Sequence, residues 1–520
     1  MPAIDLFDAG AQRHPERACL VGTGFRRSYR AVRAATCRIA NALARDGFAP
    51  GARAAVYSGN DADAFTCVLG LLRAGLVWLP INPHNAVEEN ARLLDAFDCD
   101  VLFVHSEFLD ALAAIASAAS RITHVICIDR DDARVPSLEA WTAGCADEFA
   151  ARAIADDAWA SISATSGTTG RPKGVMMAQR NLIAFSQGHA QLLTADNPIV
   201  YLAAAPLTHV AGRLCFPVLR AGGTIVVLAR PDADAVLAAI PEYRVTRLFL
   251  PPTAIYKLLA QPNVHDIDCS SLKYFMYGAA PMSVDKLKEA LAVFGPVMTQ
   301  GYGQTEAPML IAHLRPEDHY RDGVPGGAVA DDDRLASCGK PTPFVRVGIM
   351  DEAGALLAPG AVGEIVVRGD IVMQGYYRDA SATAEALRDG WLHTGDVGRI
   401  DPEGFLHIVD RRKDMIITGG FNVYSAEVEQ VILGLPGVQD CAVIGVPDST
   451  WGEAVKAVVQ PLPGAALDAA AIIAACRPQL GGVKTPKTVE IWPDLPRSPA
   501  GKILKREIRQ QFWAGRTRNV

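Results

Sequence analysis

The sequence lacks the features of several protein classes. Its 11 cysteines are scattered singly and form no C-x-x-C pair, so they predict neither a disulfide framework nor a zinc site. The N-terminus has no basic start followed by a long apolar run, and the apolar stretch at 68–81 is interrupted by Arg73 and too short to cross a bilayer. We therefore expect a cytoplasmic protein with no integral membrane segment.

An excess of positive charge is also missing. The formal net charge is −7, which argues against nucleic acid as the main partner. Hydrophobic residues make up 50% of the chain and charged residues 21%, so a sizeable core is expected and disorder is not. The length of 520 residues suggests about three or four domain-sized units.

Strand-like and helical segments alternate through the first part of the chain. Apolar residues recur at helical spacing over 29–46, whereas short apolar runs such as 53–57 and 247–251 predict strands. Because strands that alternate with helices form parallel sheets, the pattern predicts an α/β fold with doubly wound sheets. From about 331 to 408, short strands between Gly/Pro turns predict a β-rich subdomain.

A charged run, Asp410 to Asp414, separates these textures from a compact α+β pattern. A helix with Ser425 as its N-cap is predicted there, followed by strands at 441–446 and 454–459. We predict a large N-terminal domain over 1–410 and a small C-terminal domain over 411–520, with the boundary in the charged run.

The stretch at 165–175, TSGTTGRPKGV, follows a strand-like run at 159–164 and precedes a helix-like run that begins near Arg180. Its glycines let backbone N–H groups approach an anion, and its hydroxyls and lysine add donors without a competing carboxylate. It contains no Walker motif. The composition fits a phosphate cradle or, alternatively, a plain surface turn. The candidate phosphate-binding residues are Thr165, Ser166, Gly167, Thr168, Thr169, Gly170 and Lys173.

Two further stretches carry chemistry suited to a nucleotide. The YGQTE sequence at 302–306 follows a probable strand at 297–299, and the carboxyl ends of such strands are where α/β sheets place ligands. It offers an aromatic ring for a base, a hydroxyl for phosphate and a carboxylate for Mg²⁺. Asp396, in WLHTGD, offers a carboxylate for a pair of ribose hydroxyls, and an ordinary loop or turn is the alternative for each stretch.

Five motifs together resemble those of one superfamily. TSGTTGRPKG resembles the signature loop of the AMP-forming adenylating enzymes, which include acyl-CoA synthetases, luciferases and peptide-synthetase adenylation domains. YGQTE, HTGD, DRRKD and PRSPAGKILK match further motifs of that superfamily in the same order, with Lys505 where arginine is common. The resemblance covers essentially the whole chain and is closest to stand-alone fatty-acyl or aryl-acid CoA ligases.

The resemblance implies a role for each matching residue. Catalysis would fall to Lys502, which bridges the acid and the α-phosphate, to Thr305, which contacts that phosphate, and to Glu306, which binds Mg²⁺. Lys413 would be the hinge of a mobile C-terminal domain. Adenine and ribose would be bound by Gly278, Ala279, Ala280, Tyr302, Gly303, Asp396 and Arg411. The coenzyme A tunnel would include Gly419, Gly420 and Phe421.

The acid pocket of the superfamily lies between the segment after strand 199–205 and the strand end at 278–282. Here its neighbours are mostly apolar and small or flexible, which suits a fatty, alicyclic or aromatic acid. No acidic residue is present there to pair an amino group, whereas Arg213 could pair a second carboxylate. The pocket candidates are His209, Val210, Gly212, Arg213, Met282 and Met309.

The expected function is that of an AMP-forming acyl-CoA synthetase that uses ATP, Mg²⁺, coenzyme A and a small carboxylic acid. The chain stops soon after Lys502, which leaves no room for a carrier domain and favours free coenzyme A over a carrier-protein acceptor. Three alternatives stay open: a carrier-protein loading enzyme, a dicarboxylate CoA ligase and a non-catalytic nucleotide-binding sensor. The assembly, including a homodimer, stays open as well.

Overall fold

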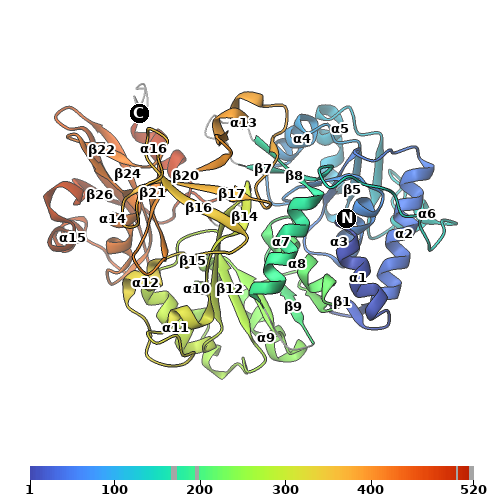
Figure 1. Cartoon of the computed structure of the whole chain (residues 1–520), viewed down its shortest axis with the longest axis horizontal. Coiled ribbons are helices and arrows are strands. Elements are labelled where there is room, and N and C mark those ends of the chain that lie inside the picture. Colours follow the sequence, from blue (N-terminus) through green and yellow to red (C-terminus); the bar gives the residue numbers. More distant parts are fainter. Residues whose placement is uncertain (166–172, 194–197, 499–501, 514–520) are drawn as a thin grey trace.

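The computed structural model describes residues 1–165, 173–193, 198–498 and 502–513. Its elements form a large N-terminal part, a β-rich sheet and a separate C-terminal unit at one end of the molecule (Figure 1). No helix within these ranges is both long enough and apolar enough for a membrane span.

A nine-stranded sheet forms the first layer. Its order is β15-β14-β13-β12-β11-β9-β10-β1-β2, and the strands from β13 to β1 run parallel to their neighbours, as predicted for a doubly wound sheet. The strands are β1 (Ala18–Gly22), β2 (Phe25–Ser28), β9 (Val200–Ala203), β10 (Thr224–Val227), β11 (Arg247–Leu250), β12 (Tyr274–Gly278), β13 (Met298–Gln304), β14 (Ala307–Leu314) and β15 (Lys340–Pro341).

A seven-stranded sheet forms the second layer, in the order β18-β8-β7-β4-β3-β5-β6. Its outer strands β8 and β18 are antiparallel to their neighbours. The strands are β3 (Arg53–Tyr57), β4 (Val77–Pro80), β5 (Val101–Val104), β6 (His124–Cys127), β7 (Trp159–Thr165), β8 (Lys173–Ala178) and β18 (Gly375–Tyr376).

Helices connect the strands of both sheets, and one continuous apolar core joins them. Helix α3 is the most deeply placed, since every one of its residues except Asp63 is buried, as expected for a helix packed on all sides. The helices are α1 (Asp5–Arg13), α2 (Tyr29–Arg45), α3 (Ala62–Arg73), α4 (Val87–Ala96), η1 (Ser106–Ala111), α5 (Leu112–Ala118), α6 (Leu138–Thr142), α7 (Gln179–Leu192), α8 (Val210–Arg220), α9 (Ala233–Tyr243), α10 (Pro252–Leu259), η2 (Val264–Asp266), α11 (Val284–Phe294) and η3 (Pro316–His319).

The β-rich region follows as an antiparallel sheet, which agrees with the texture predicted for 331–408. Its last strand continues through Asp410 and Arg411, so the charged run begins inside a strand. The elements are α12 (Asp332–Ala336), β16 (Val345–Met350), β17 (Gly363–Gly369), α13 (Ala380–Ala386), β19 (Leu387–Arg388), β20 (Trp391–Ile400) and β21 (Leu406–Arg411).

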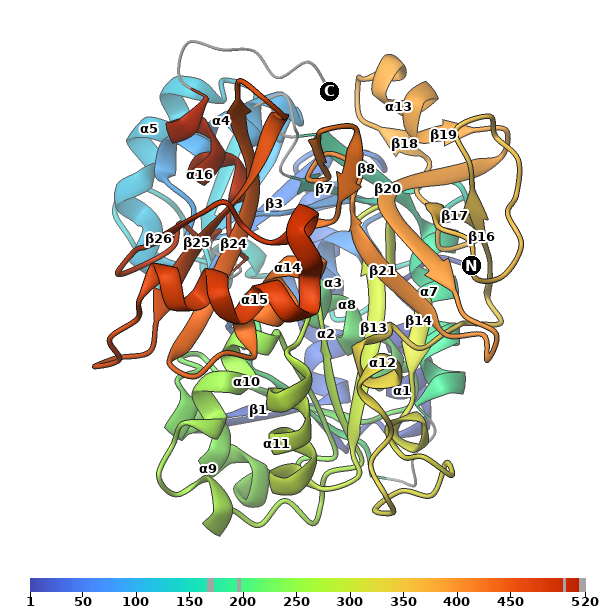
Figure 2. The same cartoon turned by 90° about the vertical axis from the view of Figure 1, so that its left-hand side faces the viewer.

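The C-terminal unit has its own apolar core and a five-stranded sheet, and it lies toward the viewer in the upper left of Figure 2, above α10 and α11. Its helix α14 contacts β21. The elements are β22 (Ile416–Thr418), β23 (Phe421–Val423), α14 (Ser425–Leu433), β24 (Val438–Asp448), β25 (Gly452–Pro461), α15 (Ala469–Lys484), β26 (Thr488–Ile491) and α16 (Lys505–Phe512).

The predicted N-cap of α14 is wrong by one residue. Tyr424 occupies the N-cap position and makes no side-chain cap, whereas Ser425 is the first helical residue. The Ser425 hydroxyl donates to Asp410 Oδ1 at 3.0 Å and accepts from Lys505 Nζ at 2.8 Å. The buried carboxylate of Asp410, on β21, therefore binds the Ser425 hydroxyl that the local sequence pattern had assigned to the cap of the helix.

Candidate active site

The YGQTE stretch lies in a tight β-hairpin. The predicted strand at 297–299 continues through Gln304, because β13 pairs antiparallel with β14, and Thr305 and Glu306 form the turn between them. A Cβ atom on Gly303 would lie 2.1 Å from the Met309 nitrogen, so the hairpin requires glycine there. The register also shifts between Tyr302 and Gln304, and such a bulge changes the direction in which the following side chains point.

The adjoining strand end shows the same close packing. A Cβ atom on Gly278 would lie 2.6 Å from the Gly301 carbonyl oxygen of the neighbouring strand. Ala279, directly after β12, has a φ of 66°, and Met309 has a φ of 45°. Positive φ values at non-glycine residues carry strain, and such residues cluster at functional sites. Both positions were predicted from sequence to line the nucleotide or acid site.

Asp396 connects three distant parts of the chain. The Tyr302 hydroxyl donates to Asp396 Oδ2 at 2.6 Å, and Arg411 Nε lies 3.2 Å from Asp396 Oδ1. Asp396 and Arg411 face each other across β20 and β21, and Asp396 is only 3% exposed. Burial, followed by the nearby Asp396 charge, raises the pKa of Tyr302 well above its usual range. The structure thus brings together three of the residues predicted to bind adenine and ribose.

Glu306 faces the strands that flank the predicted phosphate loop. The Tyr376 hydroxyl donates to Glu306 Oε1 at 2.8 Å, and the Lys173 ammonium nitrogen lies 4.9 Å from the centre of the Tyr376 ring. Thr165 and Lys173 are paired residues at the ends of β7 and β8. The other predicted phosphate-binding residues, Ser166, Gly167, Thr168, Thr169 and Gly170, lie outside the described residues.

Tyr376 was not anticipated from the sequence. It belongs to no motif and lies 70 residues after Glu306. Its position comes from the antiparallel pairing of β18 with β8, in which Tyr376 faces Val175. The only local signal is a strand-like QGYY stretch, which predicts an edge strand but not its partner.

Arg213 extends from the first turn of α8 toward the phosphate-loop strands. Its Nη2 donates to Ser163 Oγ on β7 at 3.0 Å. Burial lowers its pKa to about 10, and the charge of Glu306 acts in the opposite direction. The guanidinium therefore remains charged at neutral pH, close enough to Glu306 for the two charges to interact.

The other predicted pocket residues differ in their surroundings. His209 is exposed at the N-cap of α8, and Val210 follows it as the first helical residue, whereas Met282 and Met309 are buried. A Cβ atom on Gly212 would lie 1.9 Å from the Leu207 carbonyl oxygen, so Gly212 is needed for the close turn that starts α8. The structure thus gives Gly212 a backbone role.

Lys502 lies within electrostatic reach of the residues predicted for the nucleotide site. Burial lowers its pKa to about 8, helped by the positive charge of Arg411 and opposed by Asp396. The side chain nevertheless remains exposed to solvent. The charge of Asp396, in the predicted N-terminal domain, therefore acts on Lys502, in the predicted C-terminal domain.

The predicted hinge is held by the C-terminal unit. Arg509 on α16 donates to Asp414 Oδ1 at 3.0 Å and to the Lys413 carbonyl oxygen at 3.5 Å. Next to it, Lys505 Nζ lies 2.7 Å from Glu429 Oε1. Burial raises the pKa of Glu429 to about 7, although Lys505 lowers it. Two cations of α16 thus stabilise acidic groups on α14 and in the hinge.

Replacing Lys505 with methionine is expected to destabilise the C-terminal unit by about 1–3 kcal/mol, because the partly buried Glu429 would lose its ion-pair partner and would have to take up a proton or stay charged without one. Hydrogen exchange of β24 and β25 measures this loss as a lower opening free energy. The control is Lys484→Met, which removes the half-exposed pair with Glu427 and should cost about 0–1 kcal/mol. Equal effects of the two substitutions would contradict the role given to Lys505.

The predicted coenzyme A residues form an exposed hairpin. Gly419 and Gly420 connect β22 to β23 with φ values of 56° and 82°, which favour glycine at both positions. The Gly419 N–H donates to the Trp451 carbonyl oxygen at 2.8 Å. Phe421 is 61% exposed and Trp451 52% exposed, so two aromatic rings face solvent at this tip.

The fold combines a large N-terminal part with a separate C-terminal unit, and the residues predicted for the nucleotide site include contacts among Tyr302, Asp396 and Arg411. Two family profiles match the chain: AMP-binding enzyme over residues 7–377, and AMP-binding enzyme C-terminal domain over residues 427–502. The chain belongs to the AMP-binding enzyme family.

Similar proteins of known activity and structure extend over nearly the whole chain. A feruloyl-CoA synthase from an Amycolatopsis species is 37% identical over 96% of this chain and 97% of its own. The solved structure of the amide bond synthetase McbA from Marinactinospora thermotolerans has a TM-score of 0.89 at 33% identity, and covers 98% of this chain and 100% of its own. ATP-bound MatB from Rhodopseudomonas palustris has a TM-score of 0.88 at 32% identity, over 98% and 99%.

Proposed function

We propose that this chain is an AMP-forming acyl-CoA synthetase. In the first half-reaction, an oxygen of the acid attacks the α-phosphorus of ATP, and the bond to the bridging oxygen breaks so that pyrophosphate leaves. In the second, the thiolate of coenzyme A attacks the acyl carbon and AMP leaves with the carboxyl oxygen. The observation that carries the proposal is the contact of Asp396 with Tyr302 and Arg411, together with the effect of the Asp396 and Arg411 charges on Lys502.

The chain's own residues would act mainly by positioning and electrostatics. Lys502 would stabilise negative charge that develops on the α-phosphate, and Thr305 would donate a hydrogen bond to it. Asp396 would bind the ribose hydroxyls of the nucleotide in addition to, or in place of, its present contacts with Tyr302 and Arg411. The strand ends at Thr165 and Lys173 would hold the phosphate cradle beside Glu306.

Glu306 fits a magnesium ligand, since hard cations prefer carboxylate oxygens and the residue lies beside the strands that carry the phosphate loop. When bound, Mg²⁺ would neutralise charge on the phosphates. Arg213 donates a hydrogen bond to Ser163 and interacts electrostatically with Glu306. These interactions favour a role for Arg213 on the phosphate side of the site over the pairing of a second carboxylate. This geometry favours a monocarboxylic acid.

The pH dependence of the first half-reaction follows from Lys502. Its ammonium form is the active one, so pyrophosphate release should decline as pH rises through about 8. A lysine with an ordinary pKa near ~10.4 would keep its charge there. Measuring kcat/KM for pyrophosphate release across this range tests the idea. The control, Lys502→Arg, stays charged and should lack this decline, whatever its absolute rate.

An assay with a panel of acids tests the function as a whole. Fatty, alicyclic and aryl acids are supplied with ATP and Mg²⁺, with and without coenzyme A, and pyrophosphate and thioester are measured separately. Acid-dependent pyrophosphate release with thioester formation supports the proposal. Release without thioester formation from free coenzyme A would favour a carrier-protein acceptor, and no release with any acid would favour a nucleotide-binding sensor.

A further inference from the structure

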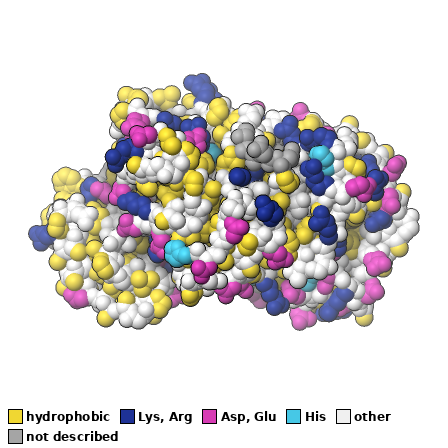
Figure 3. All heavy atoms as spheres, turned by 90° about the horizontal axis from the view of Figure 1, so that it is seen from below, with side chains coloured by type: hydrophobic (Ala, Val, Ile, Leu, Met, Phe, Trp, Pro, Cys, Tyr) yellow, Lys and Arg dark blue, Asp and Glu magenta, His cyan; other side chains and the backbone are white. Residues whose placement is uncertain are grey.

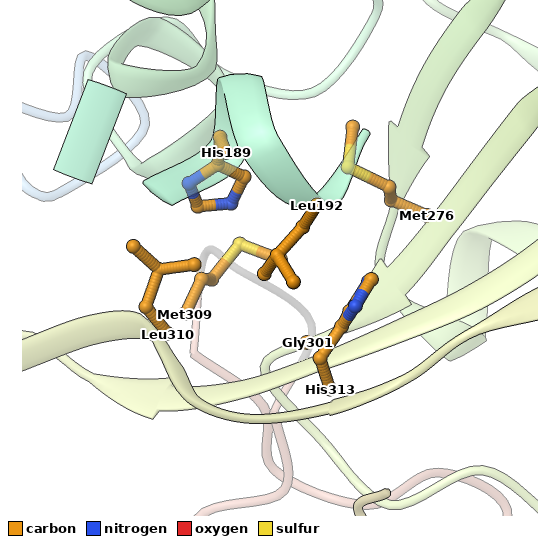
Figure 4. Close-up of a pocket in the computed structure, with 7 residues that line it drawn as sticks. All are labelled: His189, Leu192, Met276, Gly301, Met309, Leu310 and His313. Atoms are coloured by element: carbon orange, nitrogen blue, oxygen red, sulfur yellow. The ribbon is translucent and has the colours of Figure 1, made fainter. Parts of the chain in front are cut away.

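A small, mostly apolar cavity is lined in part by Met309, one of the residues predicted for the acid pocket. It has a volume of about 10 Å³, which is room for about one oxygen atom or water molecule. Figure 4 shows it between α7 and the strands β12 to β14. The lining residues are His189, Leu192, Met276, Gly301, Met309, Leu310 and His313.

Two buried imidazoles face this space from opposite sides, His189 from α7 and His313 from β14 (Figure 4). They are 3% and 8% exposed. Among the described residues, His313 Nδ1 has no hydrogen-bond partner. Because an unpaired buried polar atom costs free energy, its persistence in an otherwise apolar lining calls for a ligand.

The hydrogen bonds around the rings define what such a ligand must offer. His189 Nδ1 lies 3.0 Å from the Phe185 carbonyl oxygen, which only accepts, so Nδ1 carries the proton and Nε2 a lone pair. The Thr299 hydroxyl donates to the Leu314 carbonyl oxygen at 3.0 Å, so it accepts from His313 Nε2 at 2.8 Å. The nitrogen left on each ring is therefore an acceptor.

Charge excludes an anionic ligand group. Burial lowers the pKa of His189 to about 4 and that of His313 to about 3, so both rings are neutral near pH 7. Two neutral acceptors would repel a carboxylate and give no hydrogen bond to a ketone. An uncharged hydroxyl, such as that of an alcohol or a phenol, can donate its single O–H to the unpaired His313 Nδ1.

Met309 borders this cavity. A Cβ atom on Gly301 would lie 2.7 Å from the Met309 methyl carbon, so the absence of a side chain at Gly301 makes room for the thioether. Methionine side chains adapt readily to a ligand. A ring that displaces the Met309 side chain would thus bring a hydroxyl oxygen into a cavity of matching size.

We infer that His313, opposite the neutral ring of His189, accepts a hydrogen bond from the substrate, so that the preferred acid is a cyclic one with a hydroxyl group at the end far from its carboxylate. The inference rests on the proposed function and deepens it by naming the substrate class. His313 is the specificity-determining residue, because its free acceptor is the one left unpaired.

Matched aryl acids test the inference. Pyrophosphate release is measured with cinnamic, para-hydroxycinnamic and para-methoxycinnamic acids, and with benzoic and para-hydroxybenzoic acids. In at least one series, kcat/KM should be about 10- to 100-fold higher for the hydroxy acid, with no gain for the methoxy acid, which lacks a donor. Ratios within about twofold in both series would overturn the inference and leave the proposed function intact, whereas no release from any acid would overturn both.

Variants of His313 assign the preference to its ring. His313→Leu should reduce the ratio to about one, whereas His313→Asn, which places an amide oxygen near the Nδ1 position, should retain part of it. His319→Leu is the matched control, because this buried ring has both nitrogens engaged by Tyr277 and Arg315. Its ratio should equal that of the wild type even if the protein is less stable, and a full preference in His313→Leu would contradict the role of His313.

Discussion

Replacing Lys502 with alanine is expected to reduce acyl-adenylate formation by at least about 100-fold, because one preorganised charge at a developing anion contributes on that scale. The structure adds a reason for a large effect. Burial and the positive charge of Arg411 already lower the pKa of the ammonium to about 8, so a phosphate that pairs with it would relieve an unfavourable environment. Single-turnover measurement of acyl-AMP from acid and ATP gives the loss.

The second half-reaction of the same variant provides the contrast. Thioester formation from supplied acyl-AMP and coenzyme A should stay within about threefold of the wild-type rate, since the α-phosphate is already joined to the acid. A similar loss in both half-reactions would contradict the role of Lys502. Circular dichroism and nucleotide binding of the variant separate this result from misfolding.

Replacing Lys413 with proline is expected to produce the opposite pattern, with adenylation nearly unchanged and the thioester step slowed by at least about 100-fold. In this structure Lys502 already lies at the nucleotide site, whereas the Gly419–Gly420 hairpin faces solvent. The thioester step would therefore need the C-terminal unit to rotate about the segment at 410–414. Proline fixes one backbone angle of that segment and opposes the rotation.

Separate assays of the two half-reactions check this prediction. Lys413→Ala is the control, because it removes the same side chain and leaves the backbone free, and it should support both steps at similar rates. If the proline variant carried out both steps normally, 413 would not be the pivot. If it lost both, local misfolding would be the cause, since Arg509 contacts the Lys413 carbonyl oxygen in this arrangement.

The surface fits a small-molecule enzyme. On the face shown in Figure 3, basic and acidic side chains of the described residues are interspersed and do not gather into a basic stripe. This distribution agrees with the formal net charge of −7.

Local patterns in the sequence were enough for the architecture. Alternating apolar runs and amphipathic helices predicted the parallel sheets, and the change to short strands with Gly/Pro turns predicted the β-rich sheet. The motifs were readable for a local reason as well. Gly303 and Gly278 lie where two backbones approach too closely for any side chain, so the requirement for glycine is visible in the sequence. Errors came where a distant partner decided, as when Asp410 engaged Ser425 and displaced the predicted N-cap.

By itself, then, the sequence determined the family and the fold class and predicted the residue types of a nucleotide site, because these depend on local spacing and side-chain chemistry. Only the tertiary structure decided which distant residues come close together. Tyr376 reaches Glu306 because β18 joins the edge of a sheet, the charge of Asp396 acts on Lys502 of the C-terminal unit, and His189 lines the same cavity as His313 because a helix lies over a hairpin. Each contact joins segments far apart in the chain, and no local pattern records the distance between them.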